Sequence, residues 1–513
     1  MKVKFFGHNC YLLQGDRMNL LIDPWLSKSG AFFGSWFQWP INHNLLPNLL
    51  ADIRNSKETF IYISHEHQDH FDIETLKELR KIACKCVIPK YFDSFLYDSL
   101  ISLGYEVTQV QDQKKLYFND FDSIELLIID TGVTHDSAAI IEIEKKIFVN
   151  QNDCKVFDRL HYLANKDVEF YAVQFSGASW HPVCYDIDQV EKQRISKKKT
   201  MSKLVAVRNA LKILNPKYYL PSAGPAIFPF HDPFLSLGED NIFVHQPKLS
   251  KFLSNSDTCV VYLKPGDTFK ISSLYQPIEP PSLDLLRNLK NNLECKFDDV
   301  SDADFKSDIF KEAIQGRLNE IVGIKIAFCP NLIFKWGHNG FLVDLNELTI
   351  KNINFDGFEF DRDYMMVEAS PAYFSLMSDP KNRWQDIYLS LRAKVKREPD
   401  TFNTFLNIFL FSDLSNIKLG FETTLSINDE RILLINAVDG KNYEINRYCP
   451  HNGADLKNAE VDINGNVICP RHNWLFNLSN GGNCTSSEIS IEACEVMETT
   501  TLCENITTRL TKI

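Results

Sequence analysis

A histidine-rich loop between a strand-like run and a helix-like run narrows the folds open to this chain more than any other feature. Residues 59–64, TFIYIS, have the β-branched and aromatic composition of a strand, and residues 73–82 space Leu and Ile as a helix does. Four side chains of metal-ligand type stand within six residues between them: His65, His67, Asp69 and His70. Imidazole with carboxylate suits Zn or Fe better than Ca or Mg. Three histidines so close together, in a chain with 13, favour a metal site over a solvated polar loop.

The first part of the chain alternates short strands with helices. This order favours an α/β sandwich. The remaining strand-like runs are residues 2–6, 11–13, 19–22, 126–129, 138–143, 146–150 and 218–221, and a basic helical stretch covers 192–214.

Two changes in composition divide the chain. The segment 272–281, SSLYQPIEPP, is rich in proline, and after about residue 414 the sequence becomes short strands with turns such as Asn464-Gly465. We therefore predict an α/β domain over 1–275, a mixed α+β middle segment over 276–413 and an all-β domain over 414–513. The middle segment carries helical stretches at 285–293, 305–321 and 384–393 but no chemical motif, so its role stays open.

A second metal signature lies in the last domain. It pairs Cys449-Pro450-His451 with Cys469-Pro470-Arg471-His472. Two thiolates and two imidazoles at this spacing suit one zinc ion, or a [2Fe–2S] cluster with Cys449 and Cys469 on one iron and His451 and His472 on the other. Cys484 is not needed as a ligand in either case.

Charge and motifs exclude several partner classes. The net charge of −12 argues against a nucleic-acid partner and against an anionic membrane surface. An odd count of 13 cysteines spread over the chain, with no leader-like N-terminus and no long apolar run, indicates a cytoplasmic protein without a membrane segment. Because we find neither G-x-G-x-x-G nor a P-loop, we expect no nicotinamide or flavin site of its own.

The pattern H-x-H-x-D-H after a strand resembles the metallo-β-lactamase superfamily, whose metal site lies at the edge of an αββα sandwich. The resemblance implies that Asp69 and His70 belong to the catalytic centre and that downstream strand ends supply further ligands. On the matching positions these are His135 after LLIID, Asp153 after FVNQN and His231 in PFHDPF. His8 and Asp23 resemble early positions near the same site.

The flanks of the second signature, CPHNGA and CPRHNWLF, with Gly481-Gly482-Asn483-Cys484 after them, are similar to the loops of a Rieske domain. This resemblance implies the [2Fe–2S] cluster rather than zinc. A Rieske centre together with a β-lactamase-like domain resembles the CMP-N-acetylneuraminate hydroxylases and the UDP-N-acetylmuramate hydroxylases. The order of domains, sandwich first, looks more like the second of these.

That combined resemblance implies a monooxygenase that turns the N-acetyl group of a nucleotide sugar into N-glycolyl, with O₂ activated at a non-haem iron in the first domain. A separate ferredoxin, cytochrome or reductase must then supply the electrons. Whether the protein forms a homo-oligomer stays open. The candidates for substrate contacts are Trp25, Ser176, Trp180 and Ser222, and those for phosphate contacts are Lys192, Arg194 and Lys197 to Lys199. The alternatives are a metal-dependent hydrolase, such as a lactonase or phosphodiesterase, with a redox-regulatory Rieske domain, and a non-enzymatic electron carrier.

Overall fold

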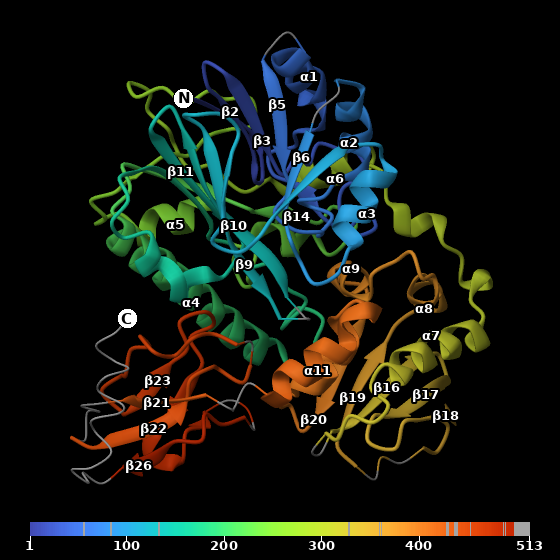
Figure 1. Ribbon diagram of the computed structural model, residues 1–513. Coiled ribbons are helices and arrows are strands. Elements are labelled where there is room, and N and C mark those ends of the chain that lie inside the picture. The colour runs from blue at the N-terminus through green and yellow to red at the C-terminus, as the bar shows by residue number, and fades with distance from the viewer. Residues whose placement is uncertain are drawn as a thin grey trace.

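The computed structural model describes residues 1–54, 57–82, 85–131, 134–326, 329–358, 360, 362–426, 430–434, 440–451, 453–485, 487 and 489–496. Figure 1 shows a layered N-terminal body, with the middle of the chain and the C-terminal strands packed side by side beneath it. Helix α4 (Gln189–Leu214) runs along the N-terminal body toward the C-terminal strands.

Two sheets form the centre of the N-terminal body. The first has six strands in the order β1-β2-β3-β5-β6-β7, and the second has seven in the order β15-β13-β12-β11-β10-β9-β8. The first sheet consists of β1 (Lys2–Gly7), β2 (Cys10–Gln14), β3 (Met18–Ile22), β5 (Glu58–Tyr62), β6 (Lys85–Pro89) and β7 (Glu106–Val110). The second consists of β8 (Lys115–Tyr117), β9 (Ser123–Asp130), β10 (His135–Ile143), β11 (Lys146–Asn152), β12 (Val168–Gln174), β13 (Tyr218–Ser222) and β15 (Cys259–Val260), and a short ribbon pairs β4 (Phe37–Gln38) with β14 (Ala226–Ile227).

Alternation along the strands buries both faces of each sheet. In β3, Leu20 and Ile22 pack between the two sheets, whereas Leu21 packs against helices on the outer face. This period of two is the strand geometry expected for a sheet covered on both sides. The outer layers are α1 (Leu46–Arg54), α2 (Ile73–Leu79) and α3 (Phe95–Ser102) on the first sheet, and α4 with α5 (Gln246–Phe252) on the second. The predicted αββα sandwich is therefore confirmed.

The middle of the chain builds a five-stranded sheet in the order β18-β17-β16-β19-β20. Its core is continuous with the sandwich, because Trp36 lies in the same hydrophobic cluster and its indole N–H donates to the Leu389 carbonyl at 2.5 Å. The strands are β16 (Asn331–Trp336), β17 (Asn339–Asp344), β18 (Thr349–Asn354), β19 (Tyr364–Glu368) and β20 (Lys394–Glu398). The helices are α6 (Leu283–Lys290), α7 (Ser307–Asn319), α8 (Pro371–Ser378), α9 (Trp384–Leu389), α10 (Thr404–Phe411) and α11 (Ile417–Ser426).

The C-terminal part carries two three-stranded sheets, as expected for an all-β domain. One contains β21 (Arg431–Leu434), β22 (Asn442–Asn446) and β26 (Cys494–Val496), and the other contains β23 (Asn466–Ile468), β24 (Leu475–Asn477) and β25 (Asn483–Cys484). The division at 275 and 413 stays a prediction, and residues 497–513 of the predicted third domain lie outside the described residues. Among the described residues, every helix is too short or too polar to cross a lipid bilayer.

Candidate functional site

The histidine-rich loop lies where strands of both sheets end. Strands β3, β5 and β6 are parallel, so Asp23 after β3 and His65 after β5 emerge at the same edge. Asp153 follows β11 of the second sheet, and His8 lies in the turn between β1 and β2, with φ of 53°. Because the strands of both sheets end at this edge of the sandwich, ligand-type side chains from four separate segments come together there.

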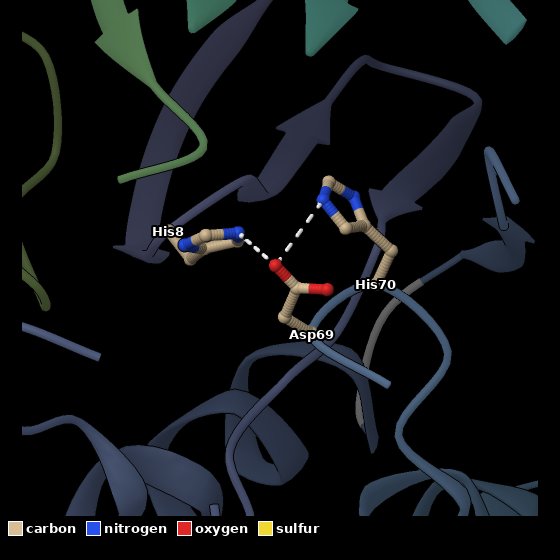
Figure 2. A group of neighbouring side chains, drawn as sticks. All are labelled: His8, Asp69 and His70. Atoms are coloured by element: carbon tan, nitrogen blue, oxygen red, sulfur yellow. Dashed lines mark ion pairs between the residues drawn. The ribbon is translucent and has the colours of Figure 1, made fainter. Parts of the chain in front are cut away.

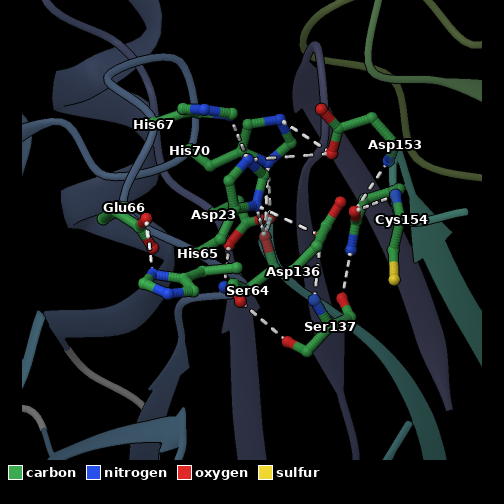
Figure 3. A network of polar contacts seen from close by, with 12 residues as sticks. Asp23, Ser64, His65, Glu66, His67, His70, Asp136, Ser137, Asp153 and Cys154 are labelled. Atoms are coloured by element: carbon green, nitrogen blue, oxygen red, sulfur yellow. Dashed lines mark hydrogen bonds and ion pairs between the residues drawn. The ribbon is translucent and has the colours of Figure 1, made fainter. Parts of the chain in front are cut away.

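A first triad of ligand-type atoms consists of His65, His67 and Asp153. Their ligand atoms lie within 4.8 Å of one another. His65 Nε2 is 2.8 Å from His67 Nδ1 and 3.8 Å from Asp153 Oδ1. Figure 3 shows the three side chains pointing toward one another from the loop and from the end of β11.

A second triad, His8, Asp69 and His70, lies beside the first. Its ligand atoms also fall within 4.8 Å of one another, and His8 Nε2 is 3.1 Å from Asp69 Oδ2. Figure 2 shows Asp69 between the two imidazoles. Asp153 joins the two triads, because its Oδ1 is 3.6 Å from His70 Nε2. The six residues could thus hold two metal ions that share one carboxylate.

Asp23 orients His70 rather than joining a triad. The Asp23 carboxylate accepts from His70 Nδ1 at 2.7 Å and from the Ser64 hydroxyl at 2.6 Å. The Ser64 backbone N–H donates to the other carboxylate oxygen at 2.7 Å. With Nδ1–H donated to Asp23, the free lone pair of a neutral His70 is on Nε2, the atom that faces Asp153.

The residues of the two triads fit a metal ion. His70 Nε2 and Asp153 Oδ1 are buried without a hydrogen-bond partner, which is costly for polar atoms unless a ligand supplies one. Burial disfavours a charged His70, yet Asp153, Asp69 and Asp23 outweigh burial and raise its pKa to about 10. This surplus of negative charge favours a bound cation, and a set of imidazoles and carboxylates suits Zn or Fe.

Two predicted ligands, His135 and His231, lie outside these triads. His135 is in contact with Glu66 at 3.2 Å and Asp93 at 3.1 Å through Nδ1, while Asn416 is 3.0 Å from its Nε2. The imidazole of His231 stands edge-on to Phe228, and burial lowers its pKa to about 4. In the part of the chain that the structure describes, the second triad contains His8 and not His231.

The middle segment reaches the metal loop through a buried ion-pair network. Arg383 Nη2 is 2.6 Å from Glu66, which stands between His65 and His67, and Arg383 Nε is 3.0 Å from Asp413. Glu66, His135 and Asp413 also form a group of ligand type, but Arg383 already supplies a positive charge there. Arg383 and His135 outweigh the effect of burial and hold the pKa of Glu66 below its usual value.

Replacing Arg383 with glutamine is expected to destabilise the fold by about 3–5 kcal/mol, because Glu66 would stay buried without its cation and Asp413 would lose its partner. Urea unfolding followed by fluorescence measures the effect. Arg287→Gln is the matched control, since Arg287 and Asp284 form an exposed pair whose loss should change stability by less than about 1 kcal/mol. Equal midpoints for the two variants would contradict the role assigned to Arg383.

The Cys-x-His and Cys-x-x-His loops share one backbone pattern. The Cys449 N–H donates to the Ala454 carbonyl, and the Cys469 N–H donates to the Trp474 carbonyl, both at 2.9 Å. In each loop the residue four positions after the cysteine donates back to the cysteine carbonyl and has a left-handed backbone, with φ of 61° at Gly453 and 54° at Asn473. The two loops therefore present cysteine and histidine in matching ways.

The ends of these loops fit a cluster with two thiolate and two imidazole ligands. His451 Nδ1 and His472 Nδ1 are buried without a hydrogen-bond partner, and the two ring centroids are 4.5 Å apart. A hydrogen bond from Cys449 lowers the pKa of Cys469 despite burial, with help from the backbone N–H groups of Arg471 and His472. A site that favours thiolate and neutral imidazole meets the requirement for [2Fe–2S] ligation.

One cavity connects the two metal-binding regions. Its volume is about 690 Å³, and His67 and Asp153 line it together with His451 and His472. The size lies within the range of small-molecule pockets. Both regions therefore face the same internal space within one chain.

The predicted substrate residues are placed differently from one another. Trp180 lines the cavity, with its ring 4.2 Å from that of Phe411. Trp25 is buried against His8 at a ring distance of 5.0 Å, and the Ser222 hydroxyl donates to Asn9. Ser176 is buried near the same edge and does not line the cavity.

Among the predicted cations, Arg194, Lys198 and Lys199 line the cavity, whereas the Lys192 ammonium donates to a backbone carbonyl. Lys155 also lines the cavity, although it was not among the cations predicted from the sequence. Its position two residues after Asp153 was the one feature of the sequence that pointed to this site.

Comparisons with known proteins agree with both sites. A model of the β-lactamase superfamily domain matches residues 2–182, and a model of the Rieske [2Fe-2S] domain matches residues 408–492. A Rieske 2Fe-2S iron-sulfur protein of Mycolicibacterium smegmatis is 24% identical over 533 residues, covering 94% of this chain and 97% of its own. The cytidine monophosphate-N-acetylneuraminic acid hydroxylase of Xenopus laevis is 23% identical over 436 residues, covering 79% of this chain and 70% of its own.

A shorter match involves one segment of 70 residues. A metal-dependent hydrolase of Pyrobaculum islandicum is 33% identical over 70 residues, covering 14% of this chain and 24% of its own. Together with the two triads and the paired Cys/His loops, the matches support a metal and a [2Fe–2S] cluster. The chain thus combines a β-lactamase-superfamily domain with a Rieske [2Fe–2S] domain.

Proposed function

We propose that this protein is a Rieske-dependent monooxygenase that hydroxylates the N-acetyl group of a nucleotide sugar to N-glycolyl. The observation that carries the proposal is the single cavity lined by His67 and Asp153 on one side and by His451 and His472 on another. A hydrolase needs no electrons, whereas an oxygenase needs a redox centre and a metal site that face one substrate. The name of the relative from Xenopus laevis supports the choice of an N-acetylated nucleotide sugar.

The overall reaction consumes O₂, two electrons and two protons, and it yields the N-glycolyl product and one water. When bound, the Rieske cluster supplies single electrons and a non-haem iron with open positions supports O₂ chemistry. We propose a separate ferredoxin, cytochrome or reductase as the electron donor.

The chain's own residues hold and shield the cavity. Trp474 stacks on His451 at a ring distance of 4.0 Å, and Phe402 stands edge-on to both rings. These aromatic faces exclude water beside the histidines. Trp180, in the segment between β12 and α4, also lines the cavity and offers an apolar surface to a sugar or base.

A buried ion pair connects the Rieske loop to the segment that carries Asp153. Arg471 Nη2 is 2.9 Å from Asp158 Oδ2, and Arg471 Nε is 3.1 Å from Asp158 Oδ1. Asp158 lies in the 3₁₀ helix η3 (Val156–Tyr162), and its side chain is 2% exposed. A forked pair of this kind sets orientation as well as distance, so we expect it to hold the cluster side of the cavity against the metal side.

Replacing Arg471 with glutamine should slow substrate-dependent reoxidation of the reduced cluster about tenfold or more, because the loop loses a charge-assisted contact. Stopped-flow absorbance after O₂ addition measures this rate, and EPR of the reduced protein checks that the cluster is retained. Lys441→Gln serves as the control, since Lys441 pairs with half-exposed Glu495 within the Rieske domain. An unchanged rate with an intact EPR signal would show that the pair does not position the cluster.

The proposed function is tested by reducing the protein anaerobically and then adding O₂ with UDP-linked or CMP-linked N-acetyl sugars. Mass spectrometry should show a gain of one oxygen on one of them, and ¹⁸O₂ should label it. No oxygen gain on any of these sugars would defeat the substrate assignment.

A metal-dependent hydrolase is the second candidate, favoured by the 70-residue match to the hydrolase of Pyrobaculum islandicum. In that case zinc-loaded protein without the cluster should turn over lactones or phosphodiesters without any reductant. The same preparation should be inactive if the monooxygenase proposal is correct.

A further inference from the structure

We propose that Lys155, Lys199 and Arg397 form an anion-binding subsite on the cavity wall that takes a phosphate or diphosphate group of the substrate. The inference rests on the proposed function for its substrate, and it adds the part of the cavity that recognises the charged end. All three side chains line the cavity, yet they come from three segments: the chain after β11, helix α4 and strand β20.

Charges of both signs line the cavity. Of the lining carboxylates, Asp136 and Asp153 belong to the surroundings of His65. Glu191 and Asp400 are each paired with an arginine near them in sequence, Arg194 and Arg397. Asp400 therefore compensates the charge of Arg397, which adds N–H donors to the subsite, while Lys155 and Lys199 supply its net positive charge.

The two lysines make no ion pair, although Asp153 and Asp136 attract Lys155 from a longer distance. No carboxylate of the described residues lies within ion-pair distance of Lys155 or Lys199. The Lys199 ammonium donates to the His181 carbonyl at 2.9 Å, which leaves its charge uncompensated. Like charges gathered inside a protein repel one another unless an anion binds between them.

Lys199 lies beside the other cations of the cavity wall. Its side chain is exposed to solvent and lines the cavity. Desolvation, followed by repulsion from Lys155 and Arg397, lowers its pKa, so the three cations stand close enough to repel one another. The same two lysines line the cavity together with His451 and His472 of the cluster site.

This geometry makes anion binding visible at the Rieske cluster. An anion held by Lys155 and Lys199 cancels positive charge beside His451 and disfavours the added electron. We therefore expect the midpoint potential of the cluster to fall when the subsite is filled.

The experiment uses the full-length protein with its metal and cluster, and inorganic pyrophosphate as the probe. Calorimetry should show binding to the wild type, and a redox titration followed by EPR should show a lower midpoint potential. Lys199→Gln should weaken binding about tenfold or more and abolish the potential shift. Lys155→Gln, checked for metal content, should act in the same direction.

Lys212→Gln is the matched control, because Lys212 is an exposed residue of the same helix. Equal pyrophosphate binding by the wild type and Lys199→Gln would place the anion on the metal and overturn the proposal. An unchanged KM of Lys199→Gln for a nucleotide sugar that the protein hydroxylates would overturn it too. Pyrophosphate binding that depends on Lys199, without hydroxylation of any nucleotide sugar, would uphold the subsite and reject the proposed function instead.

Discussion

Replacing Asp153 with asparagine should lower metal affinity in the β-lactamase-superfamily domain by about 100-fold or more while the Rieske cluster stays in place. Asp153 Oδ1 stands 3.8 Å from His65 Nε2 and 3.6 Å from His70 Nε2, so one oxygen serves both triads. An amide in its place carries no charge and presents an NH₂ group to the metal position. O₂-dependent product formation should fall by a similar factor.

Metal analysis and EPR of the reduced protein separate the two sites. The Asp153→Asn protein should lose the metal beyond the two cluster irons and keep the EPR signal of the reduced cluster. Asp112→Asn provides the control, because Asp112 makes a partly exposed ion pair with Arg159 in the same domain. Full metal content in Asp153→Asn would rule out the shared carboxylate.

Replacing Cys469 with serine should remove the Rieske cluster and reduce electron-dependent turnover by about 100-fold or more. Serine is a poor ligand to iron in place of a thiolate, and the neighbouring Cys449, His451 and His472 cannot hold the cluster alone. Because Cys449 and Cys469 belong to the core of a small domain, we also expect a lower melting temperature for that domain.

Cys484→Ser is the sharpest control for this loss. Cys484 is buried in the same hydrophobic cluster, at the end of β25, but it lies outside the two ligand loops. The control should keep the characteristic visible absorbance and EPR signal of the cluster. A Cys469→Ser protein that kept two irons and two sulfides would show that Cys469 is not a ligand.

The strand and helix pattern of the first domain was predictable because its signals are local. The predicted strand at 19–22 is the end of β3 (Met18–Ile22), and the predicted helix at 192–214 lies within α4 (Gln189–Leu214). Alternating burial and helix ends capped by Asp188 and Asn215 are set by neighbouring residues. The sandwich then follows, since both faces of its strands are apolar.

The completion of the metal triads was not predictable in the same way. His8 and Asp69 are far apart in sequence, yet they meet at 3.1 Å because β1 and β5 run in the same direction and end at the same edge of one sheet. His135 follows the family pattern in sequence, but the structure surrounds it with Glu66, Asp93 and Asn416. The contact between the middle segment and the metal loop, through Arg383 and Glu66, likewise depends on the tertiary structure.

The sequence by itself determined which ligand-type residues this protein holds at each site, and the tertiary structure decided how its parts face one another. Ligand-type residues that lie within a few positions of one another must be close in space, so their spacing can be recognised from the sequence. This holds for the histidine-rich loop, residues 65–70, and for each of the two Cys/His loops. The pairing of Arg471 with Asp158, 313 residues apart, depends instead on how two domains pack. Contacts at that separation carry no local signal, because their geometry is set by the burial and charge of whole surfaces.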